Sequence, residues 1–162
     1  MTAVLAIAAA IVVLDQITKY LALEHLAPGV PIHLVDGLLS LTLVMNPGLA
    51  FGLLGGLPEA WRWMVAVLSI AALVVLARVA IRVLSQGGWV DVGAIALIFG
   101  GAVGNLIDRA RFGAVVDFID VHWRAWHWPA FNVADSAISV GVVLLAVRLL
   151  GSPAPGTPRR AS

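Results

Sequence analysis

Long apolar stretches dominate the chain, and short polar segments separate them. Four of these stretches have about the 20 residues that a helix needs to cross a bilayer. They span residues 3–23, 61–84, 90–107 and 131–150. The pattern predicts an all-α membrane protein, with these four transmembrane helices in one domain, residues 1–150. Residues 151–162 are rich in Pro, Gly and Ala, and we expect a disordered tail there.

The first stretch also has the length of a secretory signal peptide. It lacks a basic leader and a small-residue cleavage site, and its second half carries Asp15 and Lys19. We therefore expect a retained helix.

The connector that follows, residues 24–60, contains a pattern with a period of two. Leu39, Leu41 and Leu43 alternate with polar residues, as they do in a half-buried strand. The dipeptide Asp36-Gly37 is a turn signal between this strand and residues 31–35. A small β element is therefore expected on the side of the membrane that this connector reaches, which we call the outer side.

The second connector, residues 108–130, reaches the same side if the helices alternate in direction. It mixes charged residues with Trp and His and is too elaborate for a plain loop. Orientation cannot be read from the basic residues, because equal numbers fall on the two sides. Those on the outer side are Lys19, Arg62, Arg109, Arg111 and Arg124, and the others are Arg78, Arg82, Arg148, Arg159 and Arg160.

Composition agrees with a membrane protein and narrows its chemistry. The apolar fraction is 61% and the charged fraction 12%, whereas soluble domains average nearer half and a quarter. The net charge of +1 argues against a nucleic-acid partner. Cysteine is absent from the sequence, which excludes disulfides, thiolate metal sites and a thiol nucleophile.

Polar side chains interrupt three of the four apolar stretches, always in the half nearer the outer side. Ionisable groups at membrane depth are costly and suggest function. The polar side chains are Asp15 and Lys19 in the first stretch, Asn105, Asp108 and Arg109 at the end of the third, and Asn132, Asp135 and Ser139 in the fourth. Their convergence from three helices predicts a site near the outer interface.

Simpler interpretations exist for most of these groups. Asp15 and Lys19 are four positions apart and can form a structural ion pair. Asp108 and Arg109 can be interfacial charges, and Asn132 can be a helix N-cap. Asp135 is harder to explain in this way, because it lies in an apolar run without a basic partner within one turn.

A stripe of small residues accompanies the site in the third stretch. Gly100, Gly101 and Gly104 predict close contact with another helix.

The residue types limit the possible chemistry to carboxylates. There is no H-E-x-x-H zinc motif and no G-x-S-x-G serine motif. A cluster of His122 with Asp117 and Asp120 is the one metal alternative, and we predict neither a metal nor a cofactor. Two neighbouring carboxylates that share a proton can activate water and protonate a carbonyl oxygen. Spacing alone favours Asp108 as the partner of Asp135, since both lie on helices.

Five short motifs resemble, in order and spacing, those of the lipoprotein signal peptidases, also called signal peptidase II. They are Val13-Leu14-Asp15-Gln16-Ile17-Thr18-Lys19, Asn46-Pro47-Gly48-Leu49-Ala50-Phe51, Gly104-Asn105-Leu106-Ile107-Asp108-Arg109, Val115-Val116-Asp117-Phe118-Ile119 and Phe131-Asn132-Val133-Ala134-Asp135-Ser136. The resemblance runs from about Leu14 to Leu150. Leu49 departs from the family pattern, which has Ala at this position.

The resemblance implies an intramembrane aspartic endopeptidase of the bacterial inner membrane. Such an enzyme removes the signal peptide from diacylglyceryl-modified prolipoproteins by cutting before the lipidated cysteine. The family's catalytic dyad carries over to Asp117 and Asp135, with Asp108 as the rival of Asp117. Residues that match its supporting positions are Asn46, Asn105, Asp108, Arg109 and Asn132, together with Asp15 and Lys19 of the first motif. The resemblance also implies four helices with an outer β cradle, both termini in the cytoplasm, membrane lipids as partners and a monomer.

Two other classes remain open from the residues alone. A small proton-coupled transporter or channel would also carry membrane carboxylates, although here they gather at one interface instead of forming a relay. A structural or assembly protein would use them only for stability.

Overall fold

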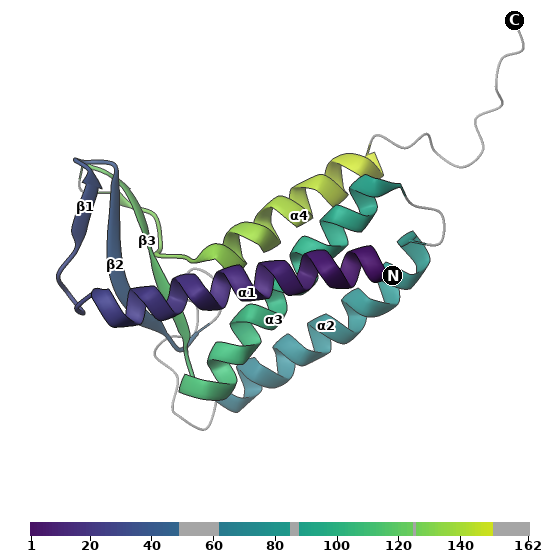
Figure 1. The fold of residues 1–162 in the computed structure, drawn as a ribbon, viewed down its shortest axis with the longest axis horizontal. Helices are drawn as coiled ribbons and strands as arrows, with labels where there is room; N and C mark the ends of the chain where they lie inside the picture. The colour runs from purple at the N-terminus through teal and green to yellow at the C-terminus, as the bar shows by residue number, and fades with distance from the viewer. Residues whose placement is uncertain (49–61, 85–87, 125, 151–162) are drawn as a thin grey trace, which may run out of the picture.

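The computed structural model describes residues 1–48, 62–84, 88–124 and 126–150. Over these ranges the chain forms four helices and four strands. In order they are α1 (Thr2–His25), β1 (Ile32–Val35), β2 (Leu39–Asn46), α2 (Arg62–Leu84), α3 (Trp89–Phe112), β3 (Val115–Trp123), β4 (Trp126–His127) and α4 (Val133–Leu150). The helices form a bundle, and the sheet lies at one end of it (Figure 1). The start of α1 and the end of α4 lie at the opposite end.

The helices match the predicted apolar stretches closely. α3 continues five residues beyond the predicted end at 107 and stops where Gly113 adopts a left-handed conformation with φ 68°. α4 begins at Val133, two residues after the predicted start. The predicted tail, residues 151–162, lies outside the described residues.

Three described helices, α1, α3 and α4, are long and apolar enough to cross a membrane. α2 contains a shorter apolar stretch, Val67–Arg78. Large apolar side chains face outward, such as Leu5 (64% exposed) and Val143 (60%). A surface of this kind is stable in lipid and not in water, so the expectation of a mainly helical membrane protein is confirmed.

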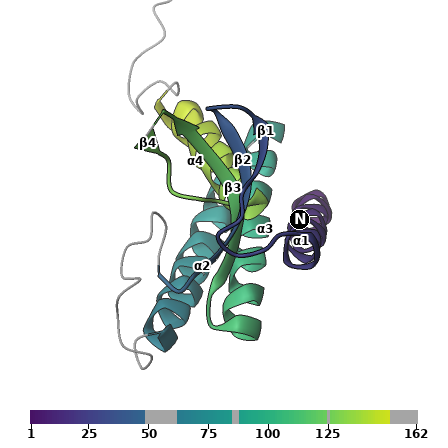
Figure 2. The same ribbon diagram turned by 90° about the vertical axis from the view of Figure 1, so that its left-hand side faces the viewer.

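α3 is the central helix and packs against α1, α2 and α4 (Figure 2). The predicted glycine stripe explains how closely α3 can approach α1 and α4. A Cβ added at Gly100 would lie 2.8 Å from the carbonyl oxygen of Ala8 in α1. Gly101 faces the backbone of Ala134 in α4, and Gly104 faces the carboxylate of Asp15. These glycines let the polar ends of α1, α3 and α4 meet.

The sheet is antiparallel with the order β1-β2-β3-β4. The predicted hairpin is confirmed: β1 and β2 pair around Asp36-Gly37, and Gly37 has φ 70°. β3 and β4 are a correction, because the sequence predicted no strand in the second connector. β3 pairs with β2, for example Val44 with Asp117. The β element is therefore larger than expected, and β3 carries one of the predicted catalytic residues.

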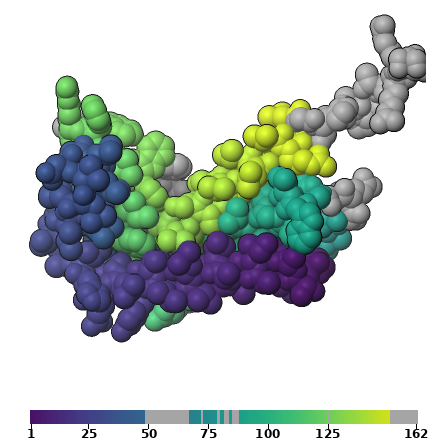
Figure 3. Space-filling model, turned by 45° about the horizontal axis from the view of Figure 1, so that its top comes forward, coloured from purple at the N-terminus to yellow at the C-terminus, as the bar shows by residue number. Residues whose placement is uncertain are grey.

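An apolar cluster fixes the sheet on the bundle. Phe118 of β3 packs with Ala22 and Leu26 near the end of α1, and Leu41 of β2 and Val133 of α4 complete the cluster. In the space-filling view the strands form one end of the molecule, while α1 runs along its side (Figure 3). This contact brings β3 next to the ends of α3 and α4.

Candidate active site

Two carboxylates from different elements line one pocket. Asp117 comes from β3 and Asp135 from the first turn of α4, and the pocket has a volume of about 710 Å³. A second pocket of about 400 Å³ between α2, α3 and α4 also reaches Asp135. Asn105 and Arg109 line both pockets, and Ser139 lies in the wall of the first.

Asp117 is buried, with 2% of its surface exposed. Its partners are neutral: the Asn46 side-chain amide donates to Oδ2 (3.0 Å) and that of Asn132 to Oδ1 (2.8 Å). Burial raises the pKa of Asp117 from its ordinary value of 3.8 to about 7, and the negative charge of Asp135 contributes to the rise. The bonds from Asn46 and Asn132 and the charge of Lys19 oppose it. Asp117 can therefore hold or release a proton near neutral pH.

Asn132 connects the carboxylate of Asp117 with the backbone of Asp135. It is the N-cap of α4, because its Oδ1 accepts a hydrogen bond from the backbone N–H of Asp135 (2.9 Å). Its Nδ2 donates to Asp117 at the same time. The predicted cap is confirmed, and the same side chain also positions both acids.

Asn105 holds the side chain of Asp135. Its Nδ2 donates to Asp135 Oδ1 (2.7 Å), while its Oδ1 accepts from Lys19 Nζ (2.9 Å) and Asn132 Nδ2 (3.2 Å). Since Lys19 can only donate, the orientation of the Asn105 amide is fixed.

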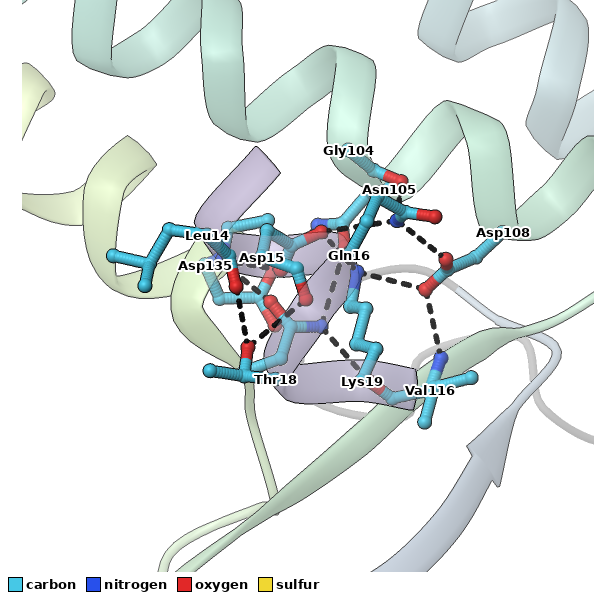
Figure 4. A network of polar contacts seen from close by, with 12 residues as sticks. Leu14, Asp15, Gln16, Thr18, Lys19, Gly104, Asn105, Asp108, Val116 and Asp135 are labelled. Atoms are coloured by element: carbon cyan, nitrogen blue, oxygen red, sulfur yellow. Dashed lines mark hydrogen bonds and ion pairs between the residues drawn. The ribbon is translucent and has the colours of Figure 1, made fainter. Parts of the chain in front are cut away.

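Lys19 lies at the centre of a buried ion-pair network (Figure 4). Its ammonium group contacts Asp15 Oδ2 (2.9 Å), Asp108 Oδ2 (2.7 Å) and Asn105 Oδ1. These three acceptors match its three N–H donors. The predicted Asp15–Lys19 ion pair is confirmed. We call Asp15, Gln16, Lys19 and Asp108 the Lys19 network.

The two acids of the Lys19 network also bind backbone groups. Asp15 Oδ1 accepts from the N–H of Ala134 in α4 (2.9 Å), and Asp108 Oδ2 from that of Val116 in β3 (3.1 Å). The network therefore joins α1, α3, α4 and β3. Asp108, which spacing favoured as the partner of Asp135, lines neither of the two pockets.

Gln16 is a residue of this site that the sequence reasoning missed. Its Nε2 donates to Asp108 Oδ1 (2.9 Å), Asp15 Oδ2 (3.2 Å) and the Gly104 carbonyl (3.3 Å). Its position beside Asp15 in the first motif was the available signal.

Arg109 connects the end of α3 with the chain that follows β2. Its guanidinium donates to the carbonyls of Gly48 (3.2 Å) and Asn105 (3.4 Å). The Gly48 N–H in turn donates to Asn46 Oδ1 (3.0 Å), which directs the Asn46 amide towards Asp117.

The metal alternative drawn from the sequence is not formed. Asp117 is engaged by Asn46 and Asn132, whereas His122 and Asp120 gather with His127. The sequence reasoning grouped His122 with Asp120 correctly, but it included Asp117 and missed His127 because it did not expect β3 and β4.

Comparison with known proteins agrees with this arrangement. A family model described as signal peptidase (SPase) II matches residues 7–151. A lipoprotein signal peptidase from Geobacter sulfurreducens is 49% identical over 138 residues, which cover 85% of each chain. One from Desulforapulum autotrophicum is 47% identical over 152 residues, or 90% of each chain.

Solved structures extend the likeness to the fold. Two structures described as bacterial membrane enzymes superpose with TM-scores of 0.77 and 0.74 at 30% and 31% identity. They cover 100% and 94% of this chain, and 96% of each solved chain is matched. The chain belongs to the signal peptidase II family.

Proposed function

We propose that this protein is an aspartic endopeptidase that removes the signal peptide from diacylglyceryl-modified prolipoproteins, cutting before the lipidated cysteine. The observation that carries the proposal is the pairing of Asp117 and Asp135 in one pocket, with Asn132 bound to both. Relatives that are named lipoprotein signal peptidases support the substrate class.

The proposed reaction needs one proton shared between the two acids. The ionised carboxylate accepts a proton from water as the water oxygen attacks the scissile carbonyl carbon. The protonated carboxylic acid donates to the carbonyl oxygen, which gives a neutral tetrahedral intermediate. When the C–N bond breaks, the carboxylic acid formed in the first step protonates the leaving amine, and the other carboxylate takes a hydroxyl proton from the intermediate, so that the pair again holds one proton. The pair titrates as a unit, so neither role is assigned to one residue.

The chemistry draws on side chains of this chain and on water. A pKa of about 7 for Asp117 supports a shared proton at neutral pH. The amides of Asn46, Asn105 and Asn132 hold the carboxylate oxygens, and Arg109 supports the wall of the pocket.

The pocket is suited to an apolar substrate. Beyond Asp135 its wall follows α4 through Ile138, Val140, Val142 and Val143. A signal-peptide helix or an acyl chain can lie against these side chains while the scissile bond reaches the acids.

The proposed topology has four membrane-spanning helices within residues 1–150, α2 being the fourth, and both termini in the cytoplasm of an inner-membrane protein. The sheet and the active site then lie at the outer interface. α1 and α3 have 24 residues each, about 36 Å at 1.5 Å per residue, which suffices to span. Trp123 of β3 and Trp126 of β4 are exposed and fit the headgroup layer. Membrane lipids are the expected partners of a monomer, and nucleic acid is not.

A cleavage assay tests the proposal. The purified protein in detergent meets a diacylglyceryl-prolipoprotein, and the product is detected by its gel shift. Asp117→Asn and Asp135→Asn should abolish the shift, Asp108→Asn should retain part of it, and Asp36→Asn serves as an exposed control. If the folded wild type never cuts the lipidated precursor, the proposal fails. Solute uptake into vesicles would then test the transporter alternative.

A further inference from the structure

A second group of titratable side chains lies on β3 and β4. It consists of Asp120, His122 and His127, and none of these residues lines either of the two pockets. We call it the β3–β4 cluster. It stands apart from the proposed function, which does not use it.

The antiparallel register of β3 and β4 brings the cluster together. His122 pairs with His127 across the strands, and their rings stack with centroids 4.9 Å apart and planes 20° from parallel. The carboxylate of Asp120 lies 3.1 Å from His127 Nδ1 and 3.6 Å from His122 Nδ1. One ligand atom from each of the three side chains lies within 4.8 Å of the others.

His122 supplies an independent sign of a missing partner. The residue is 7% exposed, and its Nδ1 is a buried atom without a hydrogen-bond partner among the described residues. The separation of 3.6 Å from Asp120 is too long for a hydrogen bond. A buried polar atom that stays unsatisfied is costly, so a group that accepts electron density from this nitrogen would stabilise the site.

We propose that Asp120, His122 and His127 bind a divalent transition-metal ion, with Zn²⁺ as the best match. Two imidazoles and one carboxylate are ligands that Zn²⁺ favours, and water can complete the coordination. Ligand distances of about 2.0–2.1 Å require the three side chains to close in by about 1 Å. His127 is exposed and can make this movement by rotating its side chain.

The position of the cluster indicates what the ion would do. β4 has only two residues, and it leads directly into Trp128 and Phe131, which line the catalytic pocket. The Trp128 N–H donates to the Val121 carbonyl (2.8 Å), so the chain that follows β4 is already bonded to β3. An ion held by His122 of β3 and His127 of β4 would fix this hairpin and the pocket wall behind it. Its role is structural.

Metal titration tests the inference directly. The full chain, purified in detergent without a polyhistidine tag and stripped with a chelator, is titrated with ZnCl2 by calorimetry and followed by thermal unfolding. We expect one ion per chain and a melting temperature that rises with Zn²⁺ concentration. His127→Gln and Asp120→Asn should weaken binding by more than about tenfold, a scale on which even the outer partners of metal ligands act.

The chain offers a matched control in His25, which ends α1 and whose ring contacts the Leu21 carbonyl. His25→Gln should bind Zn²⁺ like the wild type. Because His127 is exposed, His127→Gln is expected to fold, and circular dichroism of the stripped protein checks this. Absence of stoichiometric binding to the wild type, or equal binding by His127→Gln, would overturn the inference.

Discussion

The Lys19 network and the Asp117–Asp135 pair are neighbouring groups of buried carboxylates with opposite electrostatic environments. In the Lys19 network, both acids bind an ammonium group at 2.7–2.9 Å and a backbone N–H. In the pair, the side-chain bonds come from neutral amides. A full positive charge favours the ionised form of a neighbouring carboxylate more strongly than a neutral amide does. The first group therefore suits structure and the second suits proton transfer.

The largest expected effect is on cleavage, which should depend on the Asp117–Asp135 pair far more than on the acids of the Lys19 network. Asp117→Asn or Asp135→Asn should lower the cleavage rate by at least about 10³-fold, because each removes an acid–base group. Initial rates on a diacylglyceryl-prolipoprotein measure the loss. Asp15→Asn should keep substantial cleavage wherever the protein stays folded. Near-normal rates in either dyad variant would contradict the proposed roles.

Asp117→Asn, which should abolish cleavage, should not destabilise the protein at alkaline pH. Folding raises the pKa of Asp117 from 3.8 to about 7, so its stabilising contribution is full below pH 3.8 and is lost as the pH rises through 7. Asp117→Asn should thus be at least as stable as the wild type at pH 8. Thermal unfolding in detergent at pH 5 and pH 8 tests the sign, and a loss at pH 8 would contradict it.

Removal of the Lys19 ammonium group should destabilise the protein, because it breaks the Lys19 network. Lys19→Met leaves Asp15 and Asp108 without their ammonium partner, and breaking a buried pair in this way costs about 3–5 kcal/mol. The free energy of unfolding, measured by denaturant in detergent micelles, should fall accordingly. A control is Arg78→Met, since Arg78 is an exposed residue of α2 and does not belong to the Lys19 network. Equal stability of the two variants would mean that the network contributes little.

A smaller loss of stability is expected when the close contact between α3 and α1 at Gly104 is disturbed. The Cβ of Gly104→Ala would lie 2.5 Å from Asp15 Oδ2, and such overpacking costs about 1–3 kcal/mol. Gly93→Ala in the same helix meets no atom within 4 Å and should be neutral or slightly stabilising. Melting temperatures of the two variants give the comparison. Equal values would argue against a tight contact at Gly104.

The smallest effect concerns the pH dependence of cleavage. The value of kcat/KM should fall as the pH rises through about 7, because the pair then loses its shared proton. The hydrogen bond from Asn46 lowers the pKa of Asp117, so Asn46→Ala should move this alkaline limb to higher pH. A pH–rate profile of both proteins measures the shift. A limb that stays in place or moves to lower pH would show that Asn46 does not act on this carboxylate.

The sequence by itself determined the apolar helices, the β1–β2 hairpin, the Asp15–Lys19 ion pair and the family. Each depends on residues that are close along the chain, or on short motifs that are readable without coordinates. Helix length follows from the apolar run, and the ion pair follows from a spacing of one helical turn.

Residue spacing did not show how the acids are divided between the two groups; the family motifs indicated Asp117, and the tertiary structure supplies the contacts that separate Asp108 from the pair. β3 was not predicted because its pairing partner in β2 is distant: Asn46 and Asp117 bond across 71 positions. Spacing therefore favoured Asp108 beside Asp135, whereas the fold places Asp108 against Lys19 and brings Asp117 into the pocket. Hydrogen bonds and ion pairs at this range depend on how strands and helices pack. Spacing and periodicity along the chain do not contain that information.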